Sequence, residues 1–179
     1  HESLRTTFPA DPGGTPSQRI SEPRPFRLPV PEVAHDAGEA EVLRLAAEEA
    51  ARPFDLAEGP LLRVSLFRLK PDAHILVLVI HHIVSDGWSM GVLVRELSAL
   101  YAAFRLAATP ALPELRVQYA DYARWQRERM RAAGGGPQLD YWKEQLTGAP
   151  AVLELPTDRP RPSTQSFNGA VEPFSFGPD

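Results

Sequence analysis

Cysteine is absent from the 179 residues of this chain, and lysine is nearly absent, because Lys70 and Lys143 are the only lysines among 19 basic residues. Without cysteine the chain has no disulfide scaffold, no cysteine-ligated zinc or iron–sulfur site and no thiol nucleophile. The composition is compatible with a reducing compartment, and we expect a cytoplasmic protein.

Long hydrophobic runs and an excess of positive charge are also missing. The longest apolar run, Ile75 to Ile80, is far shorter than the ~20 residues that cross a bilayer, so no membrane partner is expected. The 23 acidic residues give a net charge of −4, which argues against a nucleic-acid partner. No glycine-rich nucleotide loop is present, and no directly bound cofactor is expected.

Strand and helix patterns interleave along the chain, which is typical of the α/β class. Alternation predicts strands over 1–8 and 62–66, whereas 9–31, rich in proline and glycine, is expected to be a loop. The run 75–80 is apolar on both faces and predicts a central, covered strand.

Four helices are predicted from apolar spacing and capping residues. Their expected ranges are 38–52 with Asp36 as cap, 90–106 with Ser89 as cap, 118–133, and 137 to about 148. In the second helix a stripe of apolar side chains is expected to face the core, namely Leu93, Leu97, Leu100 and Phe104.

Two adjacent histidines, His81 and His82, directly follow the most apolar strand, and Asp86 and Gly87 come soon after. Neighbouring side chains on a strand point to opposite faces, so one histidine is expected to face a channel and the other the packed interior. A histidine at a strand end is suited to act as a general base. Asp86 is placed to anchor the loop by an ion pair or by main-chain hydrogen bonds.

A metal site in this stretch would need a third ligand. The remaining histidines are His1, His35 and His74, and their spacing is not that of a zinc site, so no metal is expected.

A serine hydrolase or thioesterase is a minor alternative, because the segment 87–91 fits the G-x-S-x-G nucleophile elbow with Ser89 as nucleophile. That elbow leaves a strand directly, whereas seven residues separate Ile80 from Gly87. The catalytic histidine also follows the serine in that class, and no histidine follows His82.

The segment from His81 to Gly87 resembles the H-H-x-x-x-D-G signature of condensation domains of nonribosomal peptide synthetases, which are chloramphenicol acetyltransferase-like acyltransferases. Other segments are similar to further motifs of that family, in the same order. They are 1–8, similar to R-H-E-x-L-R-T-x-F without its first arginine, then 54–63, 119–125 (Y-x-D-[FY]-A-x-W), 141–142 and 155–160. The resemblance covers essentially the whole chain.

This resemblance implies a chloramphenicol acetyltransferase-like two-layer sandwich, with a mixed sheet packed against helices, as one lobe of a two-lobed domain. Residues 1–156 are expected to form the N-terminal lobe without its first strand and helix. Residues 157–179 are expected to be a crossover toward an absent C-terminal lobe. Because the family's tunnel lies between the lobes, the isolated chain is expected to be inactive and to expose an apolar patch.

The reaction implied is amide formation between thioesters held on the phosphopantetheine arms of upstream and downstream carrier domains, with a neighbouring adenylation domain supplying activated substrate. The tetrapeptide 87–90 is similar to the corresponding segment of members that take an L-configured donor. By resemblance His82 lies in the tunnel, where it either removes the proton of the attacking amine or orients the amine and stabilises the tetrahedral intermediate. His81 is expected to pack behind the strand.

The resemblance also assigns supporting roles. Asp86 is expected to fix the loop by pairing with an arginine of the first motif, of which Arg5 alone is present here. If the partner is instead the motif's missing first arginine, Asp86 is unpaired in this chain. Gly87 either allows close backbone approach at the tunnel or is a plain turn glycine. Two rival functions stay open: an acyltransferase that forms esters or uses coenzyme A thioesters, and a non-catalytic module that docks carriers.

Overall fold

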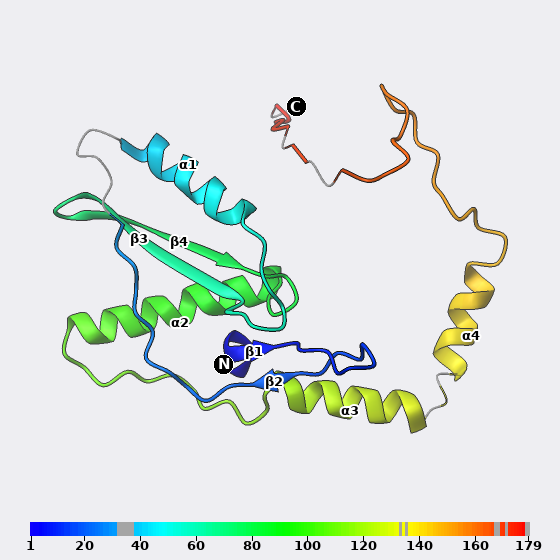
Figure 1. Ribbon diagram of the computed structural model, residues 1–179, viewed down its shortest axis with the longest axis horizontal. Helices are drawn as coiled ribbons and strands as arrows, with labels where there is room; N and C mark the ends of the chain where they lie inside the picture. Colours follow the sequence, from blue (N-terminus) through cyan, green and yellow to red (C-terminus); the bar gives the residue numbers. More distant parts are fainter. Residues whose placement is uncertain (32–37, 133, 135, 167–168, 171, 178–179) are drawn as a thin grey trace. The chain divides into compact units, whose positions relative to one another are not determined.

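The computed structural model describes residues 1–31, 38–132, 134, 136–166, 169–170 and 172–177 (Figure 1). The chain divides into two compact units, His1–Ala132 and Ala133–Asp179. Every strand found in the described ranges belongs to the first unit. The predicted cap Asp36 and the isolated His35 lie outside the described residues.

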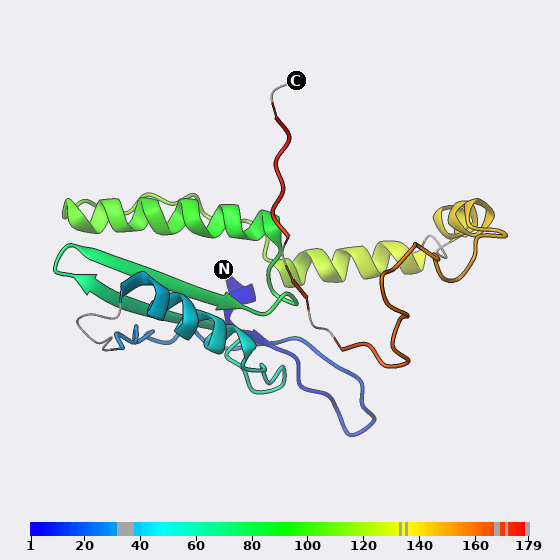
Figure 2. The ribbon, with the colours of Figure 1, turned by 90° about the horizontal axis from the view of Figure 1, so that it is seen from above.

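An antiparallel hairpin of β3 (Leu62–Lys70) and β4 (Ala73–Ile80) forms the middle of the first unit, with Leu62 opposite Ile80. Helices α1 (Gly38–Ala51) and α2 (Gly87–Arg105) lie on opposite sides of this hairpin (Figures 1 and 2). The interleaving of strands and helices expected of an α/β chain is therefore confirmed.

Strand β4 is not the central strand that its apolar run predicted, because within the described residues β3 is its one strand partner. None of its side chains is fully buried, and Leu76 is 40% exposed. The run 75–80 is apolar on both faces because a helix lies on each side of the hairpin, and not because a strand lies on each edge of β4.

The N-terminal segment contains a short 3-10 helix, η1 (Glu2–Arg5), where the alternating pattern predicted a strand. Thr6 Oγ1 donates a hydrogen bond to the Glu2 carbonyl oxygen at 2.8 Å, and Arg5 pairs with the Glu2 carboxylate at 3.0 Å. These local bonds favour a curled backbone over an extended one.

A second small sheet joins β1 (Thr6–Thr7) to β2 (Arg19–Ile20) in antiparallel register. Strand β2 lies inside the stretch 9–31 that was expected to be loop throughout. Both threonines of β1 are buried. The partner of β1 is β2, which follows a connection of eleven residues, and a pairing over this distance is not visible in local sequence patterns.

The remaining helices, α3 (Tyr119–Ala132) and α4 (Gly136–Gln145), agree closely with their predicted ranges. Helix α2 begins earlier than predicted, because Asp86 and not Ser89 is its N-cap residue. None of the helices in the described ranges is both long and apolar enough to cross a membrane.

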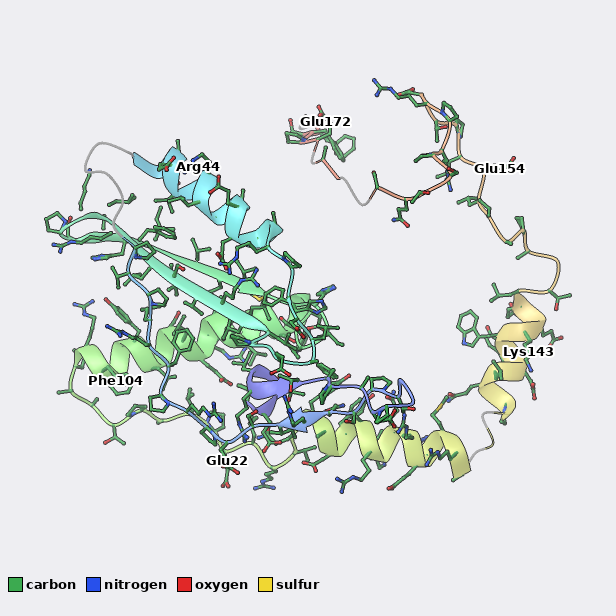
Figure 3. The ribbon with its side chains drawn as sticks, viewed as in Figure 1. Glu22, Arg44, Phe104, Lys143, Glu154 and Glu172 are labelled. Carbon is green, nitrogen blue, oxygen red and sulfur yellow. The ribbon has the colours of Figure 1, made fainter. Side chains whose placement is uncertain are left out.

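Few side chains are fully buried. The buried apolar side chains of the described residues are Val42, Leu61 and Phe67, on α1, before β3 and on β3. The stripe on α2 that was predicted to face the core is only partly covered, since Leu97 is 39% and Phe104, labelled in Figure 3, is 70% exposed. A two-stranded hairpin offers too little apolar surface to bury the whole stripe.

Candidate functional site

The two adjacent histidines begin a tight turn between β4 and α2. The His81 backbone N–H donates to the Leu61 carbonyl oxygen at 3.0 Å, which continues the β3–β4 pairing beyond Ile80. The Val84 N–H donates to the His81 carbonyl oxygen at 3.1 Å, and the Ile83 N–H donates to His81 Nδ1 at 3.0 Å. The first histidine is thus part of the turn that presents the second.

His81 and His82 differ in their surroundings, as the alternation along the strand suggested. His81 is half buried and meets the ring of Phe54 edge to face, with ring centroids 5.6 Å apart. His82 is exposed and lines a cavity, whereas His81 is not among the residues that line it.

This cavity has a volume of about 500 Å³ and is open to solvent. Four stretches of the first unit form its walls: the N-terminal segment, the region of β2, the turn that carries His82 with the start of α2, and the residues just before and at the start of α3. Its charged and polar lining includes Glu2, His82, Asp86 and Gln118. Segments that are far apart in the sequence therefore converge on the imidazole of His82.

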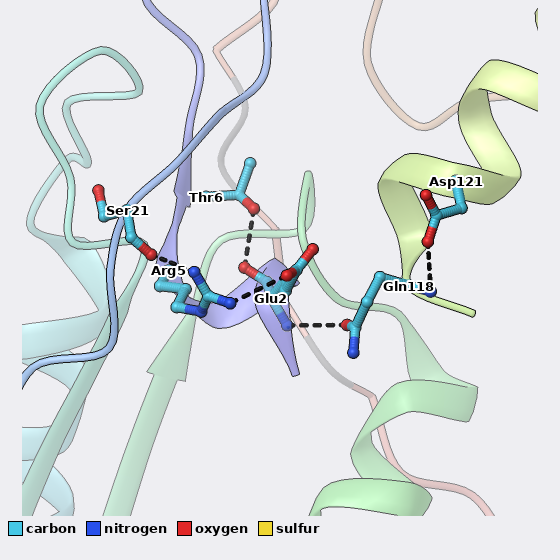
Figure 4. Close-up of polar contacts among 6 residues, drawn as sticks. All are labelled: Glu2, Arg5, Thr6, Ser21, Gln118 and Asp121. Atoms are coloured by element: carbon cyan, nitrogen blue, oxygen red, sulfur yellow. Dashed lines mark hydrogen bonds and ion pairs between the residues drawn. The ribbon is translucent and has the colours of Figure 1, made fainter. Parts of the chain in front are cut away.

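Hydrogen bonds join the walls of the cavity to one another (Figure 4). The Glu2 N–H donates to Gln118 Oε1 at 3.1 Å, and the Gln118 N–H donates to Asp121 Oδ2, also at 3.1 Å. Arg5 donates to the Ser21 carbonyl oxygen and to the Glu2 carboxylate. Because Asp121 closes the first turn of α3 in this way, the helix start is fixed against η1.

Asp86 is anchored by the start of α2. Its Oδ1 accepts hydrogen bonds from the Ser89 hydroxyl at 2.6 Å and from the Ser89 N–H at 2.8 Å. The hydrogen bonds from Ser89, and the nearby His82 to a smaller extent, lower the pKa of Asp86. The main-chain hydrogen bond foreseen for Asp86 is therefore present.

Of the two arginines that the first motif offers as partner of Asp86, only Arg5 is in this sequence, and among the described residues it is bonded to Ser21 and Glu2 and not to Asp86. Asp86 is exposed, so its charge is solvated and does not require a cationic partner. Arg5 supports the site differently, by holding η1 against the segment that follows β2.

Gly87 is the first residue of α2, and a Cβ placed on it would have no heavy atom within 4 Å. Close backbone approach at this glycine stays a prediction. Ser89 lies in the first helical turn and donates to a carboxylate, not to a histidine. The residues 81–86 separate it from β4, so the strand–turn–helix geometry of a nucleophile elbow is not formed.

Glu2 and Gln118 were not identified from the sequence, although both line the cavity. Gln118 directly precedes α3 and its aromatic motif. A polar residue just before a helix is a signal for a helix cap, and this signal could have drawn attention to Gln118. Along that motif the rings of Tyr119, Tyr122 and Trp125 contact one another in succession at tilted angles, with centroids 6.0 and 5.7 Å apart. Tyr119 also lines the cavity.

Comparisons with known proteins agree with this geometry. The model of the family described as "Condensation domain" matches residues 1–179. Phosphinothricin tripeptide synthetase PhsC of Streptomyces viridochromogenes is 46% identical over 98% of this chain and 16% of its own length. Malpibaldin synthetase of Mortierella alpina is 48% identical over 97% of this chain and 3% of its own length.

Among solved structures, the X-domain in its complex with OxyB from teicoplanin biosynthesis is 34% identical with a TM-score of 0.78, over 90% of this chain and 35% of that one. The chain thus spans a small part of the curated relatives and about a third of that structure. It belongs to the condensation domain family of nonribosomal peptide synthetases and shares the chloramphenicol acetyltransferase-like fold of that family.

Proposed function

We propose that this chain is part of a synthetase domain that joins two carrier-bound thioesters by an amide bond, and that the reaction takes place beside His82. The observation that carries the proposal is the position of His82 on the wall of a 500 Å³ cavity, in a turn that His81 and Asp86 hold from its two ends. The family match supports the same reaction class.

In the proposed reaction the amine of the acceptor attacks the carbonyl carbon of the donor thioester. The new C–N bond forms, the C–S bond breaks, and the donor's acyl group leaves its phosphopantetheine thiol for the acceptor. The amine loses one proton, and the departing thiolate gains one. A neutral His82 imidazole can take the proton from the amine and return it to the thiolate.

An alternative role for His82 is to orient the amine and stabilise the tetrahedral intermediate by hydrogen bonding. The two roles differ in the pH dependence of the chemical step. As a base, His82 must be neutral to take the proton of the amine, so the single-turnover rate falls in acid. As an orienting group, it gives a flatter profile.

We infer partners and substrate preferences from family membership. The proposed partners are upstream and downstream carrier domains, a C-terminal lobe and a neighbouring adenylation domain. Within this chain, we propose that residues 1–156 form the N-terminal lobe and that residues 157–179 form the crossover. The segment Gly87 to Met90 supports an L-configured donor. Because the described cavity is lined by the first unit alone, the isolated chain is proposed to lack turnover.

The experiment that tests this proposal uses the full-length protein with both carriers loaded, and follows products by intact-protein mass spectrometry. Three donor–acceptor pairs are compared. The first is a carrier-bound donor with a carrier-bound amine, the second a carrier-bound donor with a carrier-bound hydroxyl acceptor, and the third a coenzyme A thioester donor with the carrier-bound amine. Amide product from the carrier-bound pair alone supports the proposal. Faster ester formation, or equal use of coenzyme A, overturns it in favour of the related acyltransferases.

A docking module without turnover is the second candidate, because a solved structure similar to this chain is a complex of an X-domain with another protein. Retention of loaded carriers on the domain with no product in any of the three pairs is the result that favours docking.

A further inference from the structure

We propose that Arg63 is a positioning residue for the reaction at His82, acting through Phe54 and His81. The proposal rests on the function proposed above and goes beyond it, because neither Arg63 nor Phe54 lines the cavity. A continuous series of contacts runs from the end of α1 to the turn that carries His82.

The first contact in the series fixes the guanidinium group. Arg63 lies on β3, and its side chain is 18% exposed. Its Nη2 donates to the carbonyl oxygens of Glu49 at 2.8 Å and Arg52 at 2.9 Å, and Nη1 donates to that of Pro53 at 3.4 Å. These carbonyls lie in the last turn of α1 and just beyond it, where the regular i to i+4 bonding of the helix ends. The Glu49 carbonyl oxygen also accepts a hydrogen bond from the Arg52 N–H at 3.3 Å.

The carboxylate of Glu49 adds an ion pair on the same side, facing Arg63 Nε. Glu49 is itself 23% exposed, so this pair is better shielded from water than the pairs on the outer side of α1. A planar guanidinium held by several acceptors has one orientation.

The second contact is between Arg63 and Phe54. The guanidinium carbon lies 3.8 Å from the centroid of the Phe54 ring, within the range of a cation–π interaction. This contact covers one face of the ring and fixes its plane. The ring then presents itself to His81 edge to face, at an interplanar angle of 89°.

The third contact joins the Phe54 ring to His81, the first residue of the turn that carries His82. His81 is held between Phe54 and the turn itself, since its Nδ1 accepts the hydrogen bond of the Ile83 N–H. Residue 82 lies between these two bonded residues, so a rotation of the His81 ring displaces the backbone that carries His82. A shift of about 1 Å in a catalytic group can slow a reaction by about a hundredfold.

Arg44 offers a matched control. Arg44, which is labelled in Figure 3, lies on α1, the helix whose last turn is bonded by Arg63. It pairs with the carboxylates of Glu41 and Glu48. Its side chain is 53% exposed. Arg44→Gln therefore removes ion pairs and one arginine from α1 without touching Phe54 or the turn.

The test measures single-turnover amide formation in the full-length protein with loaded carriers, for wild type, Arg63→Gln, Arg63→Lys and Arg44→Gln. We expect the rate constant to fall about tenfold or more in both Arg63 variants, because lysine keeps the charge but not the planar group. The KM for the acceptor carrier should stay within about twofold, since Arg63 does not line the cavity. Arg44→Gln should match wild type.

The amplitude of the turnover separates positioning from folding. Partial unfolding lowers the amount of product formed while leaving the rate constant of the folded molecules unchanged. A lower amplitude with a wild-type rate constant in Arg63→Gln overturns the proposal. A lower rate constant at full amplitude supports it.

A double-mutant cycle tests the route through Phe54. Phe54→Leu removes the ring, and Phe54→Tyr keeps it. We expect Phe54→Leu to be slow, Phe54→Tyr to recover most of the rate, and Arg63→Gln to add little in the Phe54→Leu background. Additive losses overturn the route.

Histidine-selective NMR keeps this inference separate from the proposed function. With imidazole signals assigned by His81→Asn and His82→Asn, Arg63→Gln should shift the signals of both rings, and Arg44→Gln neither. If wild type forms no amide, the proposed function fails while these shifts still report the coupling. If wild type is active and the shifts are absent, the inference fails alone.

Discussion

Asp86 accepts two hydrogen bonds from Ser89, one from its hydroxyl at 2.6 Å and one from its backbone N–H at 2.8 Å. The aspartate thereby caps α2 at the point where the His82 turn ends. Carboxylate and serine act as one unit that fixes the end of the turn. The serine of the G-x-S-x-G pattern thus donates its hydroxyl proton to a helix-capping carboxylate, and no histidine is bonded to it among the described residues.

We expect Ser89→Ala to raise the pKa of Asp86 toward its ordinary value, because the Ser89 hydroxyl makes the largest contribution to lowering it. The stabilisation is present while the carboxylate is ionised, and is lost as the pH falls through the lowered pKa of the folded state. A carboxyl-carbon NMR titration of wild type and variant measures the difference. Identical titration curves contradict the assignment, and Ser98→Ala, on the same helix, serves as control.

The glycines provide a second prediction. Gly59 has a φ of +67°, and a Cβ placed on it would lie 2.9 Å from Thr7 Cγ2, so Gly59→Ala meets both backbone strain and a clash. We expect this change to lower the free energy of unfolding by about 1–3 kcal/mol. Gly91 lies within α2 with nothing within 4 Å of its Cβ position, and Gly91→Ala should raise that free energy by about 0.5–1 kcal/mol.

Urea unfolding of the full-length protein, followed by the fluorescence of a tryptophan in this chain, measures both glycine variants. Opposite signs for Gly59→Ala and Gly91→Ala are the expected result. Equal effects of the two substitutions would show that Thr7 does not constrain the loop at Gly59.

Exposed aromatic side chains lead to a third prediction, for the chain on its own. Trp88 is 85%, Phe104 70% and Tyr101 65% exposed, all on α2. Apolar surface of this extent favours association, so we expect residues 1–179 to self-associate as concentration rises. Sedimentation velocity over a range of concentrations measures this. A monodisperse monomer at all concentrations contradicts the prediction, and Trp88→Ser with Phe104→Ser should weaken any association observed.

Local periodicity was sufficient to predict that β3, β4 and all four helices exist, because each depends on residues that are close in the sequence. In the N-terminal segment, local periodicity does not predict the structure correctly. Alternation of Leu4, Thr6 and Phe8 indicated a strand over 1–8, but only Thr6–Thr7 form one, and side-chain bonds within residues 2–6 favour η1 before it.

The walls of the cavity depend on contacts that no local pattern contains. Glu2 bonds to Gln118 across 116 residues of sequence, and β2 finds its partner β1 across a proline-rich loop. The cap of α2 was assigned to Ser89 because serine favours that position, yet Asp86 occupies it and Ser89 serves as its donor. Both residue types suit a cap, so the sequence alone did not separate them.

The measurement that tests the central claim most directly is the single-turnover rate of amide formation by His82→Ala in the full-length protein with both carriers loaded. Circular dichroism confirms that the variant is folded, and His74→Ala, on the exposed part of β4, is the control. We predict that His82→Ala loses the amide product while His74→Ala keeps it. Undiminished product from a folded His82→Ala protein would contradict the account, because the chemistry would then lie elsewhere in the domain.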